Sequence, residues 1–153
     1  VADIISSGLF GDGASALLMN GGELEAEGPE VVATASVFYP DTERVMGWDV
    51  VDTGFKVVLS ATVPDVARGD ITHWVAHTGG PKVLKAFEEA LELPPAALER
   101  SWRSLREVGN LSSASVLFVL SDLMTSGATR AGDLGLMMAM GPGFCAELVL
   151  LRW

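Results

Sequence analysis

The sequence predicts an α/β domain in which a mixed β-sheet packs on a buried central helix, with further amphipathic helices beside it. Three observations indicate this fold class. The first half of the chain is mainly β, with apolar runs at 31–39, 46–51 and 55–60. Strands and helices alternate only in the second half. The segment 112–124 is apolar almost all round, which is typical of a helix buried on more than one side.

The composition is that of a globular chain. Its 153 residues, 49% of them hydrophobic, are enough for one ordinary domain or one half of a larger fold. Every apolar run is interrupted before about 18 residues, so no membrane span is predicted. The net charge of -10 disfavours nucleic acid and anionic membranes as partners.

Cellular context follows from the cysteine count and the first residues. The one cysteine, Cys145, excludes an internal disulfide and indicates a reducing compartment, so a cytoplasmic location is expected. Residues 1–8 lack an initiator Met, a basic region and a long apolar region, so they are not a signal peptide. We expect the chain to begin within a longer protein.

The segment 9–19 runs from a tight turn into an apolar strand of mainly small residues. Gly11 and Gly13 permit the turn. A phosphate-binding loop is the alternative, but this Gly-x-Gly lacks a third glycine and opens a strand rather than a helix. A dinucleotide site is therefore disfavoured.

The elements that follow in the first half are short. The β-rich run 31–39 forms a strand, and 46–51 and 55–60 form a hairpin around a turn at 52–54. Thr, Pro and Asp then begin a short helix over 62–68.

In the second half, a buried strand at 73–77 stops at Gly-Gly-Pro, and 83–91 has the apolar face of an amphipathic helix. Pro94 begins a second amphipathic helix, which ends at Gly109. The apolar stripe of that helix consists of Leu98, Trp102, Leu105 and Val108. The remaining predicted elements are the central helix 112–124 and two closing strands, 134–140 and 144–151.

The two histidines, His73 and His77, have the i, i+4 spacing of metal ligands on a helix. On a strand the same residues lie about 13 Å apart, and Trp74 stands where a zincin motif has glutamate, so no metal site is predicted. His77 ends its strand before two glycines, which suits general acid/base or oxyanion work. The spacing alone equally fits a buried, hydrogen-bonded histidine.

Asn110 and Cys145 are the other candidates for chemistry. The amide of Asn110 either points to the same oxygen as His77 or caps the following helix, where Ser112 and Ser113 would serve equally. Cys145 lies in an apolar strand, where burial raises the pKa of a thiol, so we expect it to be buried and unreactive. Gly-x-Ser-x-Gly is absent, so a hydrolase nucleophile elbow is not supported.

Four motifs occur together in a characteristic order and spacing. They are LFGDGA at 9–14, WVAHTGGP at 74–81, GNLSSA at 109–114 and GPG at 141–143. This set resembles the C-terminal half of type III polyketide synthases, the chalcone and stilbene synthase family, over essentially the whole chain. Two further segments, MGWD at 46–49 and GFKV at 54–57, resemble bacterial members, including alkylpyrone-forming ones.

The resemblance implies a thiolase-like fold of two similar α/β halves, with 1–153 as the C-terminal half. The N-terminal half, which carries the nucleophilic cysteine in this family, is absent from these residues. The implied activity is that of an acyltransferase that decarboxylates malonyl-CoA, condenses it onto an acyl-CoA starter and cyclises an alkylpyrone or resorcinol product. Coenzyme A thioesters are substrates, no cofactor is implied, and the partners are the N-terminal half and a second copy in a homodimer.

The resemblance also assigns residues. His77 and Asn110 match the catalytic pair that stabilises charge on a thioester oxygen. The implied substrate-pocket residues are Phe10 at an aromatic gate, Val57 where plant enzymes have a second aromatic, Ser112 and Pro142. The implied coenzyme A contacts are Gly79, Gly80 and Lys82.

Two alternatives remain. Ketoacyl-carrier-protein synthases that start fatty acid synthesis also use a His and Asn pair. They usually have a Gln-Ala-Asn-like segment after the histidine, however, and they lack the Gly-Pro-Gly turn. A noncatalytic scaffold with the same fold is the other. The scaffold needs neither His77 nor Asn110, so their presence favours an enzyme.

Overall fold

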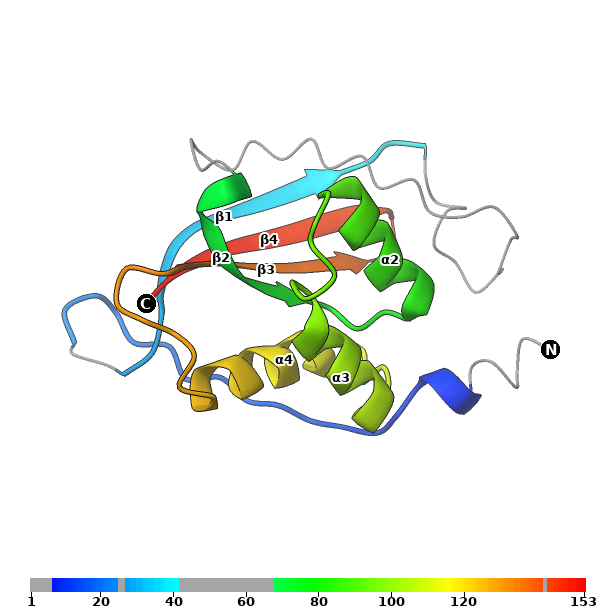
Figure 1. Cartoon of the computed structure of the whole chain (residues 1–153), viewed down its shortest axis with the longest axis horizontal. Coiled ribbons are helices and arrows are strands. Elements are labelled where there is room, and N and C mark those ends of the chain that lie inside the picture. The colour runs from blue at the N-terminus through cyan, green and yellow to red at the C-terminus, as the bar shows by residue number, and fades with distance from the viewer. Residues whose placement is uncertain (1–6, 25–26, 42–67, 142) are drawn as a thin grey trace.

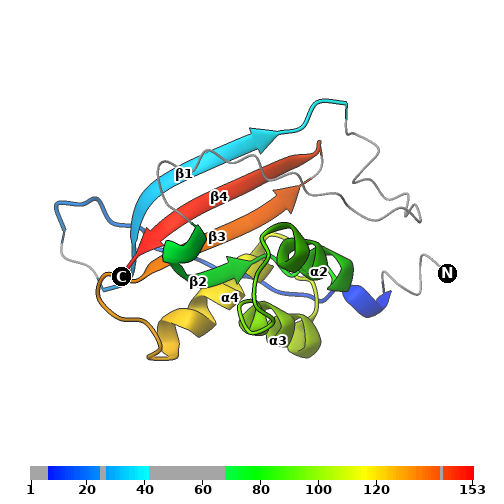
Figure 2. The same cartoon turned by 45° about the horizontal axis from the view of Figure 1, so that its top comes forward.

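The computed structural model describes residues 7–24, 27–41, 68–141 and 143–153. The strands are β1 (Glu30–Phe38), β2 (Ile71–Ala76), β3 (Leu134–Gly141) and β4 (Cys145–Arg152). They form one sheet in the order β1-β4-β3-β2, in which β4 is antiparallel to both neighbours and β2 runs parallel to β3. Figures 1 and 2 show this order across the twisted sheet. The sheet is therefore mixed, as the sequence predicts.

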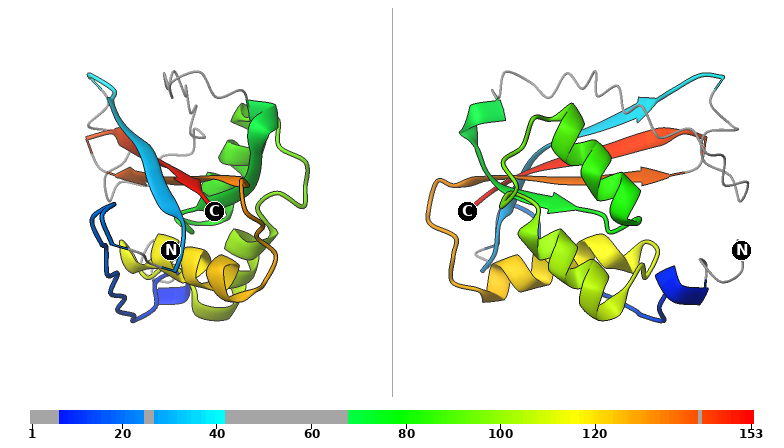
Figure 3. Two further views of the ribbon diagram at one scale, coloured as in Figure 1. Left: turned by 90° about the vertical axis from the view of Figure 1, so that its left-hand side faces the viewer. Right: turned by 45° about the vertical axis from the view of Figure 1, so that its right-hand side comes forward.

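Helices lie on both faces of the sheet. A 3-10 turn, η1 (Arg68–Asp70), precedes β2, and the helices are α2 (Pro81–Ala90), α3 (Glu99–Val108) and α4 (Ala114–Thr125). Alternate residues of β2 serve different cores: Trp74 and Ala76 join the cluster beneath α2, whereas Val75 packs with α4. Figure 3 shows α4 below the sheet and α2 on the other side.

Helix α3 connects the two layers at the β2 edge of the sheet. Its Trp102 and Leu105 pack on the α2-side core. On its other side, Arg100 and Arg103 both donate to Oδ2 of Asp122 in α4. Burial alone would raise the pKa of Asp122, but the hydrogen bonds and charges of the two arginines outweigh it and hold that pKa below its usual value.

Most predicted elements of the second half are confirmed. The strand before His77, the helix after Gly-Gly-Pro and the two closing strands match β2, α2, β3 and β4 within a few residues. The second amphipathic helix is also confirmed, but it begins at Glu99 rather than at Pro94, because 95–98 form turns first. The predicted hairpin at 46–51 and 55–60 lies outside the described residues, as does the 62–68 helix except for Arg68.

The predicted strand within 9–19 is wrong for this structure. Residues 11–21 have no regular secondary structure, and in Figure 1 this blue segment runs beneath α4, away from the sheet. A strand needs a hydrogen-bonded neighbour, and within the described parts of the chain 12–20 have none. Its apolar side chains therefore stay in solvent, with Leu17 52%, Leu18 88% and Met19 66% exposed.

Two burial predictions also need correction. Helix α4 buries Val119, Leu120 and Leu123, but Phe118 is 36% and Met124 40% exposed, so burial on more than one side is not reached. Cys145 is half-buried rather than buried, because it is the first residue of β4, paired with Phe38 and Gly141 at the strand end.

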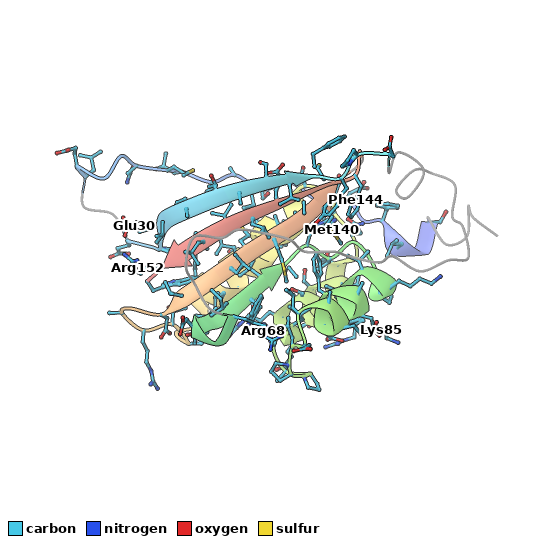
Figure 4. All side chains as sticks on the ribbon, turned by 90° about the horizontal axis from the view of Figure 1, so that it is seen from above. Glu30, Arg68, Lys85, Met140, Phe144 and Arg152 are labelled. Atoms are coloured by element: carbon cyan, nitrogen blue, oxygen red, sulfur yellow. The ribbon has the colours of Figure 1, made fainter. Side chains whose placement is uncertain are left out.

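The two ends of the sheet differ in character. Figure 4 shows Glu30 and Arg152 at one end of the β1–β4 pair, and Met140 and Phe144 at the other. Phe144 and Met140 belong to the buried core, whereas Glu30 and Arg152 lie 3.7 Å apart as an exposed ion pair. Among the described residues, no helix is long and apolar enough to cross a membrane.

Candidate functional site

The candidate site lies where β2 ends and three loops meet. His77 follows the last residue of β2 and still donates its backbone N–H to the Met138 carbonyl of β3, at 2.9 Å. Its own carbonyl accepts the Gly79 N–H at 3.0 Å, which turns the chain sharply. The backbone of His77 is thus fixed on both sides, and its side chain is half-buried at the edge of the sheet.

The side chain of Asn110 reaches this turn. Its Nδ2 donates to the Gly79 carbonyl at 3.2 Å, and its Oδ1 accepts the Ser112 N–H at 2.8 Å. Because the oxygen end is taken by an N–H and the nitrogen end by a carbonyl, only one orientation of the amide fits. An amide nitrogen has two N–H groups, and the Gly79 bond uses one of them.

The bond to Ser112 also decides between the predicted uses of Asn110. Helix α4 begins at Ala114, and its N-cap, Ser113, has no side-chain hydrogen bond. Asn110 bonds two residues ahead, before the helix, and this supports Ser112 in a left-handed conformation with φ 57°. Asn110 therefore orders the loop and does not cap α4.

Phe10 belongs to the third loop. The Leu9 carbonyl accepts the Asn110 N–H at 2.7 Å, and the Gly11 N–H donates to the Asn110 carbonyl at 3.0 Å. These two bonds pair Phe10 with Asn110 as a single parallel bridge. The phenyl side chain is 47% exposed, so it stands beside the site without being part of a core.

Glycines allow the loops to approach this closely. Gly109 has φ 79°, and a Cβ there would lie 2.7 Å from the Leu9 carbonyl oxygen. A Cβ on Gly11 would overlap the Val108 carbonyl oxygen. Any larger residue at either position has to push 9–11 away from 108–110, which would disrupt the pairing of Phe10 with Asn110.

Thr78 is a site residue to which the sequence analysis gives no role. It is 0% exposed, and its hydroxyl donates to the Gly109 carbonyl at 3.3 Å. The bond ties the His77 loop directly to the Asn110 loop. The sequence does contain a signal for Thr78, because it is a polar residue between an apolar strand and two glycines. Burying its hydroxyl there without a hydrogen-bond partner would be costly.

Burial lowers the pKa of His77 below the ordinary histidine value of 6.5. At neutral pH the imidazole is therefore uncharged, with one ring N–H to donate and one nitrogen to accept. His73 lies within β2, and its Nε2 donates to Asp133 Oδ2 at 2.9 Å. The two histidines consequently belong to different surroundings and do not share a site.

The remaining predicted site residues divide into two groups. Gly80 is the N-cap of α2, and Lys82 is an exposed residue of its first turn. Val57 and Pro142 lie outside the described residues. The loops of His77 and Asn110 are in contact, but the separation of their side-chain nitrogens stays a prediction, as do the assigned roles.

Two hollows in the described part of the chain lie elsewhere. One is beside η1 and the 92–97 turn, and the other lies between β2 and α3 and is lined by Arg100 and Arg103. Neither includes His77 or Asn110. The candidate site is therefore defined by the hydrogen bonds of three loops and not by either of these hollows.

Comparison with known proteins gives a consistent family. The profile of "Chalcone and stilbene synthases, C-terminal domain" matches residues 69–153. A "1,3,6,8-tetrahydroxynaphthalene synthase" of Streptomyces peucetius subsp. caesius is 49% identical over 100% of this chain and 46% of its own length. A "3,5-dihydroxyphenylacetyl-CoA synthase" of Amycolatopsis balhimycina is 34% identical over 97% of this chain and 45% of its own.

A solved structure supports the same assignment. The crystal structure of 1,3,6,8-tetrahydroxynaphthalene synthase from Streptomyces coelicolor A3(2), described as a bacterial type III polyketide synthase, superposes with a TM-score of 0.65. It is 31% identical, and the match covers 82% of this chain and 41% of that one. The chain spans about half the length of the curated relatives it matches. It belongs to the chalcone and stilbene synthase family, whose C-terminal domain it carries in a thiolase-like α/β fold.

Proposed function

We propose that this chain supplies the charge-stabilising part of a type III polyketide synthase site, in which His77 and Asn110 donate N–H groups to one thioester oxygen. The observation that carries the proposal is the bond from Asn110 Nδ2 to the Gly79 carbonyl, because it fixes the Asn110 amide against the His77 loop. The family assignment supports it, since the solved synthase that this chain matches is described as a bacterial type III polyketide synthase.

The proposed chemistry begins with malonyl-CoA. The bond between its carboxylate carbon and its α-carbon breaks, carbon dioxide leaves, and the electron pair remains as a thioester enolate. Two preorganised N–H donors stabilise the enolate oxygen, and each contributes about 3 kcal/mol by analogy with measured oxyanion donors. The enolate carbon then attacks the acyl thioester, and the acyl-bearing sulfur leaves as a thiolate.

A neutral His77 suits this step. An uncharged imidazole still carries one ring N–H, which it can donate to the oxyanion. When a thiolate lies nearby, its negative charge favours the imidazolium form, and the same side chain then stabilises the thiolate as an ion pair. The lowered pKa of His77 thus applies to the side chain when no thiolate lies beside it.

The nucleophile in this proposal lies outside these 153 residues, in an N-terminal half such as the one that the relatives' greater length accommodates. Cys145 is paired within the sheet between Phe38 and Gly141 and matches no catalytic position of the family. No cofactor takes part in this proposal, since the steps above involve only the two thioesters and the groups that stabilise their charge. A second copy of the whole protein completes a homodimer.

Substrate contacts are assigned on the same basis. The exposed Lys82 and the start of α2 after Gly79 and Gly80 offer a cation and a helix N-terminus to a phosphate of coenzyme A. Phe10, placed against Asn110, lines the approach to the site. The proposed acyl-pocket residues are Phe10, Val57, Ser112 and Pro142.

The product class is open to direct test. The relatives are named for tetrahydroxynaphthalene, dihydroxyphenylacetyl-CoA and phloroglucinol, which are polyhydroxylated aromatic products. We propose products of this type or the related resorcinols and alkylpyrones. The mass and the chromatographic retention time of the product identify the starter, the number of extensions and the mode of cyclisation.

The experiment compares two proteins with acyl-CoA and malonyl-CoA. One is the 153-residue chain, and the other is a chimera in which the chain replaces the region that it matches in the Streptomyces peucetius synthase. We expect product from the chimera only, and loss of that product on His77→Ala. Robust product from the chain alone would refute the external nucleophile, and Cys145 would then be the first residue to mutate. A folded chimera that binds substrates but is inactive would support the scaffold alternative.

A further inference from the structure

The hydroxyl of Ser101 binds both backbone groups of one residue at the end of β2. It accepts the Ala76 N–H at 3.2 Å and donates to the Ala76 carbonyl at 2.9 Å, and both residues are 0% exposed. In the described sheet β2 is an edge strand. The N–H of His77 points inward to β3, so the groups of Ala76 point outward by alternation. The hydroxyl thus stands where a neighbouring strand would otherwise bond.

The position of this bond relates it to the candidate site. Ala76 directly precedes His77, and Ser101 lies on α3, the helix that leads through Gly109 to Asn110. Two further bonds join the same two segments, from Thr78 to Gly109 and from Asn110 to Gly79. Ser101 makes a third connection, between the last residue of β2 and the third residue of α3.

The same helix offers a contrast. Ser104, one turn after Ser101, also has a buried hydroxyl, but that hydroxyl has no hydrogen-bond partner among the described residues. Burial of a serine on α3 therefore does not by itself produce a bond to the sheet. Ser101 occupies the apolar side of the helix between Leu98 and Leu105, and its hydroxyl is directed at the one strand end that carries His77.

We propose that Ser101 is a positioning residue for the His77 and Asn110 pair, because its hydroxyl sets the register between the end of β2 and α3. Its kinetic effect rests on the proposed function, whereas its effect on the His77 environment does not. Misplacing a reacting group by about 1 Å costs on the order of 100-fold in rate. We therefore expect Ser101→Ala to act on turnover far more than on substrate binding.

The first test follows the His77 imidazole by NMR in the 153-residue chain, which has only two histidines. In Ser101→Ala the strand end loosens, and the titration midpoint of His77 is expected to rise toward its ordinary value, since the ring regains water. Ser101→Thr keeps the hydroxyl and is expected to restore the unmodified midpoint. Ser104→Ala is the matched control variant, and the titration of the His73 signal in the same spectra is the internal control.

The second test measures kinetics in the chimera with malonyl-CoA. We expect kcat to fall about 10- to 100-fold in Ser101→Ala with KM changed less than about threefold, recovery in Ser101→Thr and no change in Ser104→Ala. A folded Ser101→Ala protein with an unmodified His77 midpoint and unmodified kcat would overturn the proposal. If only stability falls, with kcat intact, Ser101 is structural and the proposal is equally overturned.

Two outcomes separate this proposal from the proposed function. If His77→Ala leaves the chimera fully active, the proposed function fails, while the NMR result still decides the role of Ser101. If Ser101→Ala does not fold, amide hydrogen exchange in the unmodified chain replaces it. The Ala76 amide is then expected to exchange as slowly as that of His77, which is bonded to β3, and exchange at the rate of an exposed edge amide would contradict the proposal.

Discussion

His77 and Asn110 are held in different ways. Asn110 is fixed by hydrogen bonds at both ends of its amide, whereas His77 is fixed through its backbone and has its ring partly removed from water. A group held by two bonds keeps its direction, and a group that loses water keeps its neutral form. Together these effects are consistent with the proposal that both side chains donate N–H groups to one oxygen.

The lowered pKa of His77 makes stability depend on pH. Below its ordinary pKa of 6.5 the unfolded chain binds a proton that the folded chain resists, so stability is full above that pH and falls as pH drops toward the folded value. His77→Gln cannot take the proton, and we expect its free energy of unfolding to fall less between about pH 7.5 and about pH 5. Urea denaturation measures this. Equal losses in both proteins would show that His77 is not the titrating group.

Gly109 and Gly127 can be compared to test the loop junction. Both have positive φ, 79° and 67°, but a Cβ on Gly127 meets nothing within 4 Å, whereas one on Gly109 meets the Leu9 carbonyl oxygen. We expect Gly127→Ala to cost roughly 1–2 kcal/mol for the backbone alone. Gly109→Ala should cost at least about 1 kcal/mol more, because its φ of 79° and ψ of -159° lie in a region that only glycine readily adopts, and because the change also breaks the bond between Leu9 and Asn110. Equal costs in urea denaturation would argue against the close approach.

At the level of elements, α3 is the connection between the two layers. It packs on the α2-side core, bonds to the β2 edge and pairs with α4 through Asp122. Arg100 and Arg103 lie off the apolar stripe of α3, and both pair with Asp122. A solvent-facing helix surface and one that faces another helix have the same polar composition, so the pattern could not distinguish them.

Asp122→Asn tests this connection. Two arginines lower the pKa of Asp122, so its stabilising effect is present above its unfolded value of 3.8 and is lost as pH falls through the lower folded value. Since Asp122 is 41% exposed, we expect a loss of only about 1 kcal/mol at neutral pH. Glu107→Gln, at an exposed position of α3, is the control. If Asp122→Asn lowers the free energy of unfolding no more than Glu107→Gln does, the pairs of Asp122 with the two arginines do not stabilise the fold.

Periodicity predicted the elements whose apolar side chains recur at regular spacing. The strands β2, β3 and β4 and the helices α2 and α3 bury one face against each other, so their apolar spacing is visible in the sequence. The segment 14–19 has strand composition but no neighbour to bond, and composition carries no information on whether a neighbour exists. The pairing of His77 with Asn110 comes from the family resemblance and stays a prediction, whereas Thr78 and Ser101 emerge only from their hydrogen bonds to the backbone.

The exposed apolar side chains make a prediction about the whole molecule. Leu17, Leu18 and Met19 lie in one segment and are all more than half exposed, and Phe118 and Met124 of α4 are also open to solvent. Apolar surface of this kind favours association. We expect the 153-residue chain to self-associate at micromolar concentration in sedimentation velocity, and Leu18→Glu to weaken this. Asn20→Glu makes the same change of charge nearby and should have little effect. A monomer at all concentrations would contradict the expectation.

The most direct measurement of the central claim is the rate of carbon dioxide release from malonyl-CoA by the chimera. Release needs the enolate oxygen to be stabilised, and it can be followed without a starter or a cyclised product. His77→Ala and Asn110→Ala are each predicted to lower kcat by about 10²- to 10³-fold, because each removes one oxyanion donor. Circular dichroism confirms that both variants are folded. If either folded variant releases carbon dioxide at the unmodified rate, the side chain removed in it does not stabilise the oxyanion. The proposal that His77 and Asn110 share one oxyanion site would then be wrong.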